Sequence, residues 1–298
     1  MAAWQEGRVS EANVTALADL SRDDAARFLR QWGALPAETR ESVARQMLEL
    51  AELRVDLHFG RALRLLLDDP SAAIRQLAVS ALWEDEGADL PDRLLTLAAE
   101  DPSQDVVAQA VQSLAATCDR AAAGELDETE SRRLRDELLR LAAETTRAPT
   151  VRRRALEVAA VFADDARVRP LIDAFYDADE PGFRASAVYA MGRTAASRWR
   201  PRIVDEFASD DAELRFEAAR AAGELADAET LPGLIELVGD EDPEVRQAAI
   251  GAMGRTGGRA ALRALQRLTE NAAESDTDAI EAALLEAETN VDPLALER

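Results

Sequence analysis

The stretch Asp242 to Gly254, DPEVRQAAIGAMG, recurs in related form along the chain and decides the architecture. In most copies an apolar residue and an arginine are followed by Ala and further apolar residues, and in three copies also by Gly. The pair stands at Ile74-Arg75, Val151-Arg152, Phe183-Arg184, Leu214-Arg215 and Val245-Arg246, with Val106-Val107 in its place once. The six copies are 32, 45, 32, 31 and 31 residues apart. This period predicts a stacked array of repeats rather than a globule around one pocket.

Each repeat contains two expected helices. The first carries an apolar stripe at spacings of three and four, which is wide enough to bury against another helix. These stripes are Leu63, Leu66, Leu67; Pro91, Leu94, Leu95; Val168, Leu171, Ile172 with Phe175; and Leu231, Leu234, Ile235 with Val238. The second helix begins at the anchor arginine, and its positions −1, +3, +4 and +7 from that arginine are expected in the core. Glycine at +8, in Gly192, Gly223 and Gly254, is expected where neighbouring repeats approach closely.

The ends of the chain depart from the regular pattern. Residues 1–57 are expected to form capping helices, with Ser21 as a helix N-cap and Val43, Met47, Leu50 and Leu53 on one apolar face. The array is expected over 58–270, and a final helix with a frayed tail over 271–298. The one long spacing places an insertion at about 119–131, which is expected to be a solvated loop or a helix extension. It is interpreted as a tolerated insertion or as a flap beside the binding surface.

Composition narrows the class of protein. A formal net charge of −23 over 298 residues disfavours nucleic acid and anionic membranes as partners. There is no apolar run long enough for a membrane span and no leader-like amino terminus, so we expect a cytoplasmic protein. The single cysteine, Cys118, is expected to end a buried helix rather than to act as a nucleophile. No cofactor is expected.

The anchor arginines stand beside acids such as Asp210, Asp211, Asp240 and Asp242. We expect an arginine to carboxylate ladder between repeats, with some of the acids capping helices. The alternative, a calcium or magnesium site, requires oxygen ligands that converge from one loop. The segment DEDPE lacks the spacing of such a loop, so no metal is expected.

Three copies carry a family resemblance. DPEVRQAAIGAMG, DAELRFEAARAAGEL and EPGFRASAVYAMGRT resemble the HEAT repeat, in particular the short form called PBS-lyase HEAT-like, over about 58–270. The resemblance implies an all-α, armadillo-like, right-handed α-solenoid of about six to seven antiparallel helix pairs. It also implies that the second helices line a concave surface that binds a partner. The family contains chromophore lyases, hydroxylases and pure scaffolds, so the resemblance alone does not give a function.

Positions +1, +2 and +5 of the second helix are expected to face that surface. They include Gln76, Ser186, Gln247 and Gly251, together with a cluster of Tyr189, Phe216 and Arg220. Aromatic rings beside arginine are typical of binding hot spots. The alternative is that these rings only pack along the neighbouring helix.

Charge points to the same part of the chain. Residues 132–202 hold fifteen arginines and ten acids, whereas the flanking regions are acidic. Arg153, Arg154 and Glu157 complete the predicted partner-binding set, with Arg152 beside them. An Arg-rich centre attracts a partner that is acidic in part; the alternative is internal pairing with nearby acids.

The sequence is therefore interpreted as a non-catalytic, monomeric scaffold for a protein partner. The alternative is a phycobilin lyase-like enzyme or lyase subunit, which needs only a cleft and contacts to a tetrapyrrole. A di-iron hydroxylase is excluded by count, because it needs several histidines and the chain has His58 alone.

Overall fold

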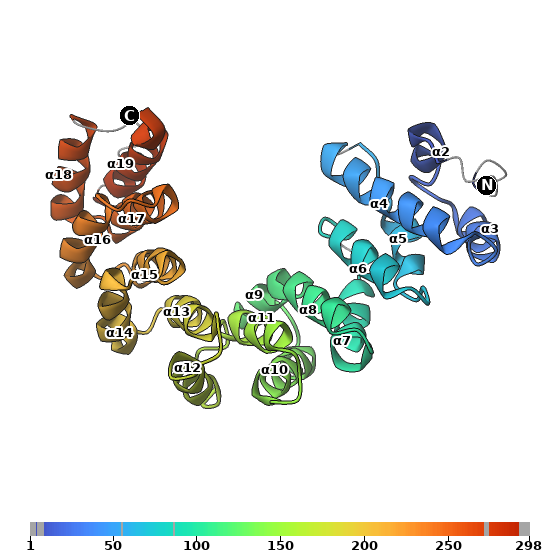
Figure 1. The fold of residues 1–298 in the computed structure, drawn as a ribbon, viewed down its shortest axis with the longest axis horizontal. Coiled ribbons are helices and arrows are strands. Elements are labelled where there is room, and N and C mark those ends of the chain that lie inside the picture. The colour runs from blue at the N-terminus through green and yellow to red at the C-terminus, as the bar shows by residue number, and fades with distance from the viewer. Residues whose placement is uncertain (1–3, 5–8, 55, 86, 271–273, 292–298) are drawn as a thin grey trace. The chain divides into compact units, whose positions relative to one another are not determined.

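The computed structural model describes residues 4, 9–54, 56–85, 87–270 and 274–291. The tail expected from Asn290 lies largely outside these residues. Secondary structure in the described residues is helical throughout (Figure 1). The α-helices are α2 (Glu11–Thr15), α3 (Arg22–Trp32), α4 (Ala37–Leu53), α5 (Gly60–Leu66), α6 (Ala72–Ala81), α7 (Leu90–Glu100), α8 (Gln104–Ser113), α9 (Ala115–Ala122), α10 (Glu128–Ala143), α11 (Pro149–Ala159), α12 (Val168–Tyr176), α13 (Phe183–Arg193), α14 (Arg200–Asp205), α15 (Ala212–Leu225), α16 (Leu231–Leu237), α17 (Pro243–Thr256), α18 (Gly258–Thr269) and α19 (Thr277–Val291).

The helices pack in sequential pairs, as the repeat predicts. α5 packs on α6, α7 on α8, α12 on α13, α14 on α15, α16 on α17 and α18 on α19. The second helices of the pairs also stack on one another, α4 on α6 on α8 and α13 on α15 on α17 on α19. The chain divides into two compact units, residues 1–158 and 159–298. Within each unit the second helices form one layer and the first helices form the other (Figure 1).

Local sequence explains where several helices begin. Ser21 accepts a hydrogen bond from the Asp24 amide at 3.1 Å, so it is the N-cap that the sequence predicts for α3. Asp211 caps α15 and Asp242 caps α17, each through an amide two residues ahead at 2.9 and 2.8 Å. Carboxylates at these ends also meet the positive pole of the helix dipole.

The predicted core positions of the second helix are confirmed. Phe183, Ala187, Val188 and Met191 are at most 1% exposed, and so are Val245, Ala249, Ile250 and Met253. Phe175 of α12 stacks on Phe183 with ring centroids 4.5 Å apart, which joins the two helices of one pair.

Three individual expectations are wrong. Ile235 is 44% exposed and Leu237 is buried in its place, because the short α16 turns Leu231, Leu234 and Leu237 towards the core. Leu53, at the last position of α4, is 79% exposed. Ser186, expected on the open surface, is 1% exposed. It lies in a run of small residues, and the surrounding parts of the protein pack closely against such a run.

The glycines at +8 fit the predicted close approach. A Cβ on Gly192 would lie 2.7 Å from Ala221 Cα, one on Gly223 would lie 3.0 Å from Ala252 Cα, and one on Gly254 would lie 2.9 Å from Ala283 Cα. Real Cβ atoms essentially never come as close as the distances at Gly192 and Gly254, and the distance at Gly223 is tighter than most real Cβ contacts. The three contacts join α13 to α15, α15 to α17, and α17 to α19. Glycine therefore sets the spacing of the second-helix layer in residues 159–298.

The arginine ladder is present, and much of it is buried. Arg75 binds Asp101 through two hydrogen bonds of 2.7 Å, and Arg215 binds Asp240 through two of 2.7 and 2.9 Å. Arg246 reaches Asp276 at 3.1 Å. Each partner belongs to the following repeat.

The same arginines also form hydrogen bonds within their own repeats. Arg75, Arg215 and Arg246 each donate to a backbone carbonyl of the preceding turn at 2.8 to 3.1 Å. Arg152 donates to the Ala142 carbonyl at 3.2 Å, and Arg184 donates to the Tyr176 carbonyl at 3.2 Å. The anchor arginine thus fastens a turn, and Arg75, Arg215 and Arg246 also bind the next repeat through hydrogen bonds to a carboxylate.

The insertion is mostly helical. Ala115–Ala122 forms α9, a loop follows, and α10 begins after the N-cap Asp127. Cys118 is fully buried within α9 rather than at its end, and burial raises the pKa of its thiol to about 12. The thiol is therefore protonated at neutral pH. No helix in the described part of the chain is long and apolar enough to cross a membrane.

Candidate functional site

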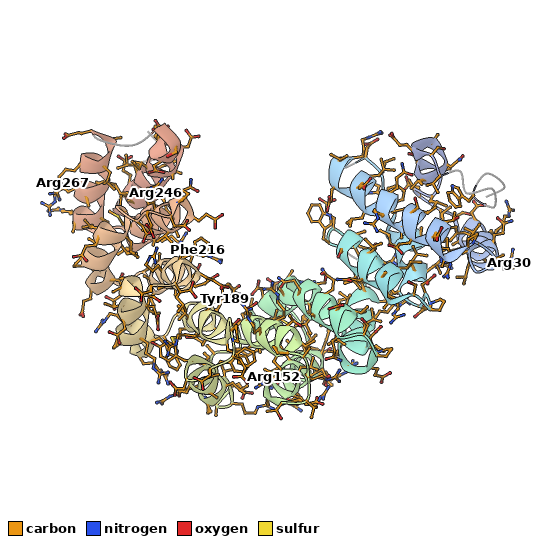
Figure 2. All side chains as sticks on the ribbon, viewed as in Figure 1. Arg30, Arg152, Tyr189, Phe216, Arg246 and Arg267 are labelled. Carbon is orange, nitrogen blue, oxygen red and sulfur yellow. The ribbon has the colours of Figure 1, made fainter. Side chains whose placement is uncertain are left out.

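Tyr189, Phe216 and Arg220 form one cluster in the second unit, on the layer of second helices. The Arg220 guanidinium carbon lies 5.4 Å from the centroid of the Tyr189 ring and 5.6 Å from that of Phe216. Both rings are half-buried, and Arg220 is exposed. Figure 2 shows Tyr189 and Phe216 on neighbouring helices of this layer. The structure therefore brings together the three residues that the register predicts to cluster. We call them the Arg220 cluster.

The packing of α13 on α15 explains this cluster. Phe216 and Arg220 are four residues apart on α15 and so share one face. Tyr189 faces them from α13, because the glycine contact at Gly192 holds the two helices close together. Cation–π contacts at exposed sites each contribute about 0.5–1 kcal/mol.

Arg220 has one further partner, Glu217 of the same helix, with 3.5 Å between the charged atoms. The arginine side chain is 45% exposed and that of Glu217 is 17% exposed. The guanidinium is thus held over two rings and still faces solvent. A group placed in this way can meet a carboxylate of another molecule without first being ordered.

The remaining three predicted residues, Arg153, Arg154 and Glu157, lie on α11 within the first unit. Arg154 binds Glu157 at 2.7 Å and is exposed, with 51% of its side chain in solvent. Arg153 is half-buried and has an interaction partner of its own. These three residues form a patch on the first unit, which we call the α11 patch. The Arg220 cluster belongs to the second unit.

A second aromatic and arginine cluster, not anticipated from the sequence, joins α12, α13 and α14 of the second unit. The guanidinium carbons of Arg184 and Arg202 lie 4.9 and 4.6 Å from the Tyr176 centroid. The Tyr176 hydroxyl donates to the buried carboxylate of Glu206 at 2.6 Å. Burial and this hydrogen bond raise the pKa of Tyr176 to about 12. Because its polar groups pair with one another, this cluster fastens α12 to the helices that follow it.

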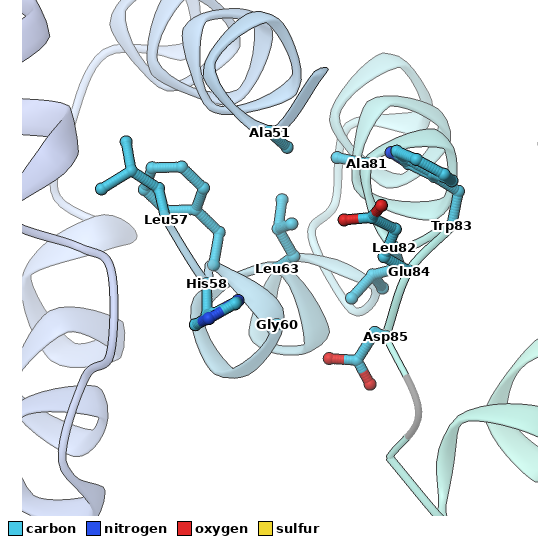
Figure 3. A pocket seen from close by; sticks show the side chains of 11 residues that line it. Ala51, Leu57, His58, Gly60, Leu63, Ala81, Leu82, Trp83, Glu84 and Asp85 are labelled. Atoms are coloured by element: carbon cyan, nitrogen blue, oxygen red, sulfur yellow. The ribbon is translucent and has the colours of Figure 1, made fainter. Parts of the chain in front are cut away.

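The first unit holds a pocket that the sequence reading did not identify (Figure 3). It contains His58, which is exposed, and the side chains of Trp83, Glu84 and Asp85. The signal in the sequence was the +8 column, where Trp83 stands eight residues after Arg75 in the position that has glycine in the last three copies. Among the described residues, no group of three or more His, Cys, Asp or Glu side chains is placed to hold a metal ion.

Comparison with known proteins identifies the repeats. Residues 201–287 match the family model described as HEAT repeats, and they include α15 and the Arg220 end of the cluster. This part of the chain consists of HEAT repeats. The match is to HEAT repeats in general, so the PBS-lyase form stays a prediction. No curated protein sequence matches the chain.

Solved structures share the fold at low sequence identity. Escherichia coli YibA is 19% identical with a TM-score of 0.52, and the match covers 94% of this chain and 98% of YibA. Kap95p from a structure with RanGDP is 13% identical with a TM-score of 0.54, and importin beta is 15% identical with a TM-score of 0.50. Both matches cover 96% of this chain but only 45% of the other protein. These likenesses show an α-solenoid fold of the HEAT and armadillo type.

Proposed function

We propose that the protein is a non-catalytic HEAT-repeat scaffold that binds a protein partner through the second-helix layer of residues 159–298. The Arg220 cluster is the centre of this surface. The observation that carries the proposal is the position of Arg220, which lies over both Tyr189 and Phe216 while its charged end stays exposed.

The composition of the cluster fits a binding hot spot. Arginine and tyrosine dominate the energetics of protein interfaces, since they combine large contact area with hydrogen bonding. Here the two rings are only half-buried, so a partner can cover them further. The 3.5 Å contact between Arg220 and Glu217 is looser than a direct hydrogen bond. A carboxylate of the partner can therefore take the better geometry, and we expect the bound segment to be acidic beside an apolar residue.

The α11 patch extends the proposal to the first unit. Arg153, Arg154 and Glu157 occupy positions +1, +2 and +5 of their helix, the same register as Phe216, Glu217 and Arg220 on α15. The Arg154–Glu157 pair is exposed, so it contributes little to stability. We propose that it contacts the same partner at a second point.

The fold supports the class of function rather than the partner. In one matched structure, Kap95p binds RanGDP. That property belongs to Kap95p, and the shared fold shows only that such solenoids offer extended helical surfaces.

Affinity capture tests the proposal. The full chain is used as bait, with the double variant Tyr189→Ala/Phe216→Ala beside the natural sequence. The matched control is Val204→Ala/Ile235→Ala, which truncates two exposed apolar side chains elsewhere in the same unit. We expect partners that are retained by the natural chain and the control but lost by the double variant. Identical partner lists for all three would remove the Arg220 cluster from the proposal.

The charge of Arg220 gives a finer measurement once a partner is found. Arg220→Glu should weaken binding more than Arg220→Lys, since lysine keeps the charge but not the planar contact with the rings. Equal effects of the two variants would mean that the charge does not contribute.

The chromophore-lyase alternative has its own experiment. Coexpression with a bilin and a phycobiliprotein subunit would give covalent chromophore attachment that depends on this protein, if it were a lyase. No specific feature of the structure favours this alternative, and the scaffold remains our proposal.

A further inference from the structure

A pocket of about 240 Å³ lies in the first unit, between the carboxyl ends of α4 and α6 and the beginning of α5 (Figure 3). Ligand pockets for small molecules usually span about 300–1,000 Å³. This one is below that range and suits a single long side chain. It is lined by Ala51, Leu57, His58, Phe59, Gly60, Leu63, Ala81, Leu82, Trp83, Glu84 and Asp85.

The pocket exists because α6 ends early. α6 has 10 residues and ends at Ala81, whereas α15 and α17 each have 14 and continue past their +8 glycines. Trp83 therefore lies beyond the helix end, and its side chain is 62% exposed beside the pocket. An indole in this position offers an apolar surface, and its ring face attracts cations.

The two carboxylates of the pocket differ in what they do. Asp85 accepts from Arg64 at 2.9 Å and from the Gly87 amide at 2.8 Å, and it packs against Gly60 so closely that a Cβ there would clash. Asp85 thus holds the loop in place. Glu84 is exposed and makes no ion pair or side-chain hydrogen bond with any described residue. Its charge is available to a ligand.

The charge of Glu84 is not offset by the arginines around the pocket. The segment 83–92, WEDEGADLPD, contains five acidic residues and no basic one, but Arg64 pairs with Asp85 and Asp89, and Arg133 pairs with Asp92. The carboxyl ends of α4 and α6 add the negative poles of two helix dipoles, of which α4 is 17 residues long. The amino end of the 7-residue α5 is met by the Asp85 carboxylate. The pocket therefore favours a cation.

We propose that this pocket binds an arginine side chain of a partner polypeptide, with a neighbouring apolar residue of that partner beside it. The aliphatic part of the arginine packs on Leu57, which is half-buried, and the guanidinium meets Glu84 and the face of Trp83. The fit follows from the charge of Glu84, the indole of Trp83 and the size of the pocket. This site is independent of the Arg220 cluster, because it lies in the other unit and selects the opposite charge.

A pair of peptides tests the proposal on the full chain. Ac-Leu-Arg-Leu-NH2 is compared with Ac-Leu-citrulline-Leu-NH2, which has nearly the same shape but no charge. Trp4, Trp32 and Trp199 are at most 5% exposed, so a change in tryptophan emission on titration reports mainly on Trp83. Trp83→Phe confirms the origin of the signal.

We expect saturable binding of the arginine peptide with a dissociation constant on the order of 1 mM, and weaker binding of the citrulline peptide. Glu84→Gln should lower the affinity for the arginine peptide by about two- to fivefold and remove most of the preference over citrulline. The control is Glu100→Gln, which makes the same change at an exposed acid outside the pocket lining. Absence of saturable binding, equal binding of the two peptides, or an unchanged preference in Glu84→Gln would each overturn the proposal.

Discussion

The second-helix layers of the two units differ at one register position. In residues 159–298, the eighth residue after the anchor arginine is a glycine pressed against the next helix, at Gly192, Gly223 and Gly254. In the first unit, the same position after Arg75 is Trp83, which is exposed beside a pocket. One side chain at +8 thus distinguishes a closed junction between repeats from an open one. The comparison shows that one junction of a solenoid can hold a pocket while the helices of other repeats stay closely packed.

The two regions also differ in the charge that they present. The second-helix layer of the second unit presents Arg220 over two aromatic rings, whereas the pocket of the first unit presents Glu84 beside the single ring of Trp83. Both combine a charge with an aromatic surface. We therefore expect them to recognise opposite charges on the molecules they bind.

The arginine ladder is common to both units and should give the largest effect on stability. Asp101→Ala in the first unit and Asp240→Ala in the second each leave a largely buried arginine without its carboxylate. We expect each to lower the free energy of unfolding by about 3–5 kcal/mol, measured by urea denaturation. The control Glu41→Ala breaks an exposed pair with Arg45 and should cost about 0–1 kcal/mol. A loss at only one of the two aspartates would mean that the units do not share the ladder as a source of stability.

The glycine spacing gives the next largest effect, and α17 offers a matched pair of positions. Gly254→Ala places a Cβ 2.9 Å from Ala283 Cα and should lower the free energy of unfolding by about 1–3 kcal/mol through overpacking. Gly251→Ala has only an Arg255 side-chain atom at 3.8 Å and should raise it by up to about 1 kcal/mol, because alanine favours helix more than glycine does. Thermal unfolding of both variants measures the difference. If both are stabilising, the +8 glycine does not set the helix spacing.

Acid should weaken the ladder of the second unit. The hydrogen bond from Arg215 holds the pKa of Asp240 below its usual value of 3.8. Because the folded-state pKa is the lower one, this carboxylate stabilises the fold above pH 3.8, and the contribution is lost as the pH falls through the folded-state pKa. Asp240→Asn should therefore lose less stability than the natural chain on acidification, as measured by urea denaturation between pH 7 and pH 3. Parallel pH profiles would contradict this assignment.

The smallest expected effect on stability is at the open junction. Trp83→Phe should leave the free energy of unfolding within about 0.5 kcal/mol, since the side chain is 62% exposed. It should nevertheless remove most of the emission that acrylamide quenches. Trp32→Phe is the contrasting variant, because Trp32 is buried and donates to Asp69 at 2.6 Å. It should lower stability and leave quenching nearly unchanged. A large loss of stability in Trp83→Phe would mean that the junction is not open.

Much of the fold could be predicted from the register of one motif. Six copies of the anchor pair located the second helices, and the core residues around Phe183 and Val245 followed from helical spacing. Two of the errors, at Leu53 and Ile235, lie at a helix end and in a short helix, because periodicity in a few residues does not specify which side faces the core. The ladder was expected, but its burial was not, since sequence shows which charges are close along the chain and not how much water reaches them.

The Arg220 cluster could be predicted because its residues keep the repeat register, so helix stacking brings equivalent positions together. The pocket was missed for the opposite reason. It depends on where α6 ends, and the Trp83 in the +8 column marks a departure from the pattern without showing that the helix ends at Ala81.

By itself the sequence determined the repeat, the helix pairs, the apolar faces and the glycine column, because each of these recurs at a fixed period. Only the tertiary structure decided that Asp85 is engaged while Glu84 is exposed, and that the Arg220 guanidinium stays exposed while it contacts both rings of its cluster. The physical reason is that helix spacing and burial follow from all neighbouring contacts together. The role of a charged side chain depends on these contacts, which come from several separate parts of the chain.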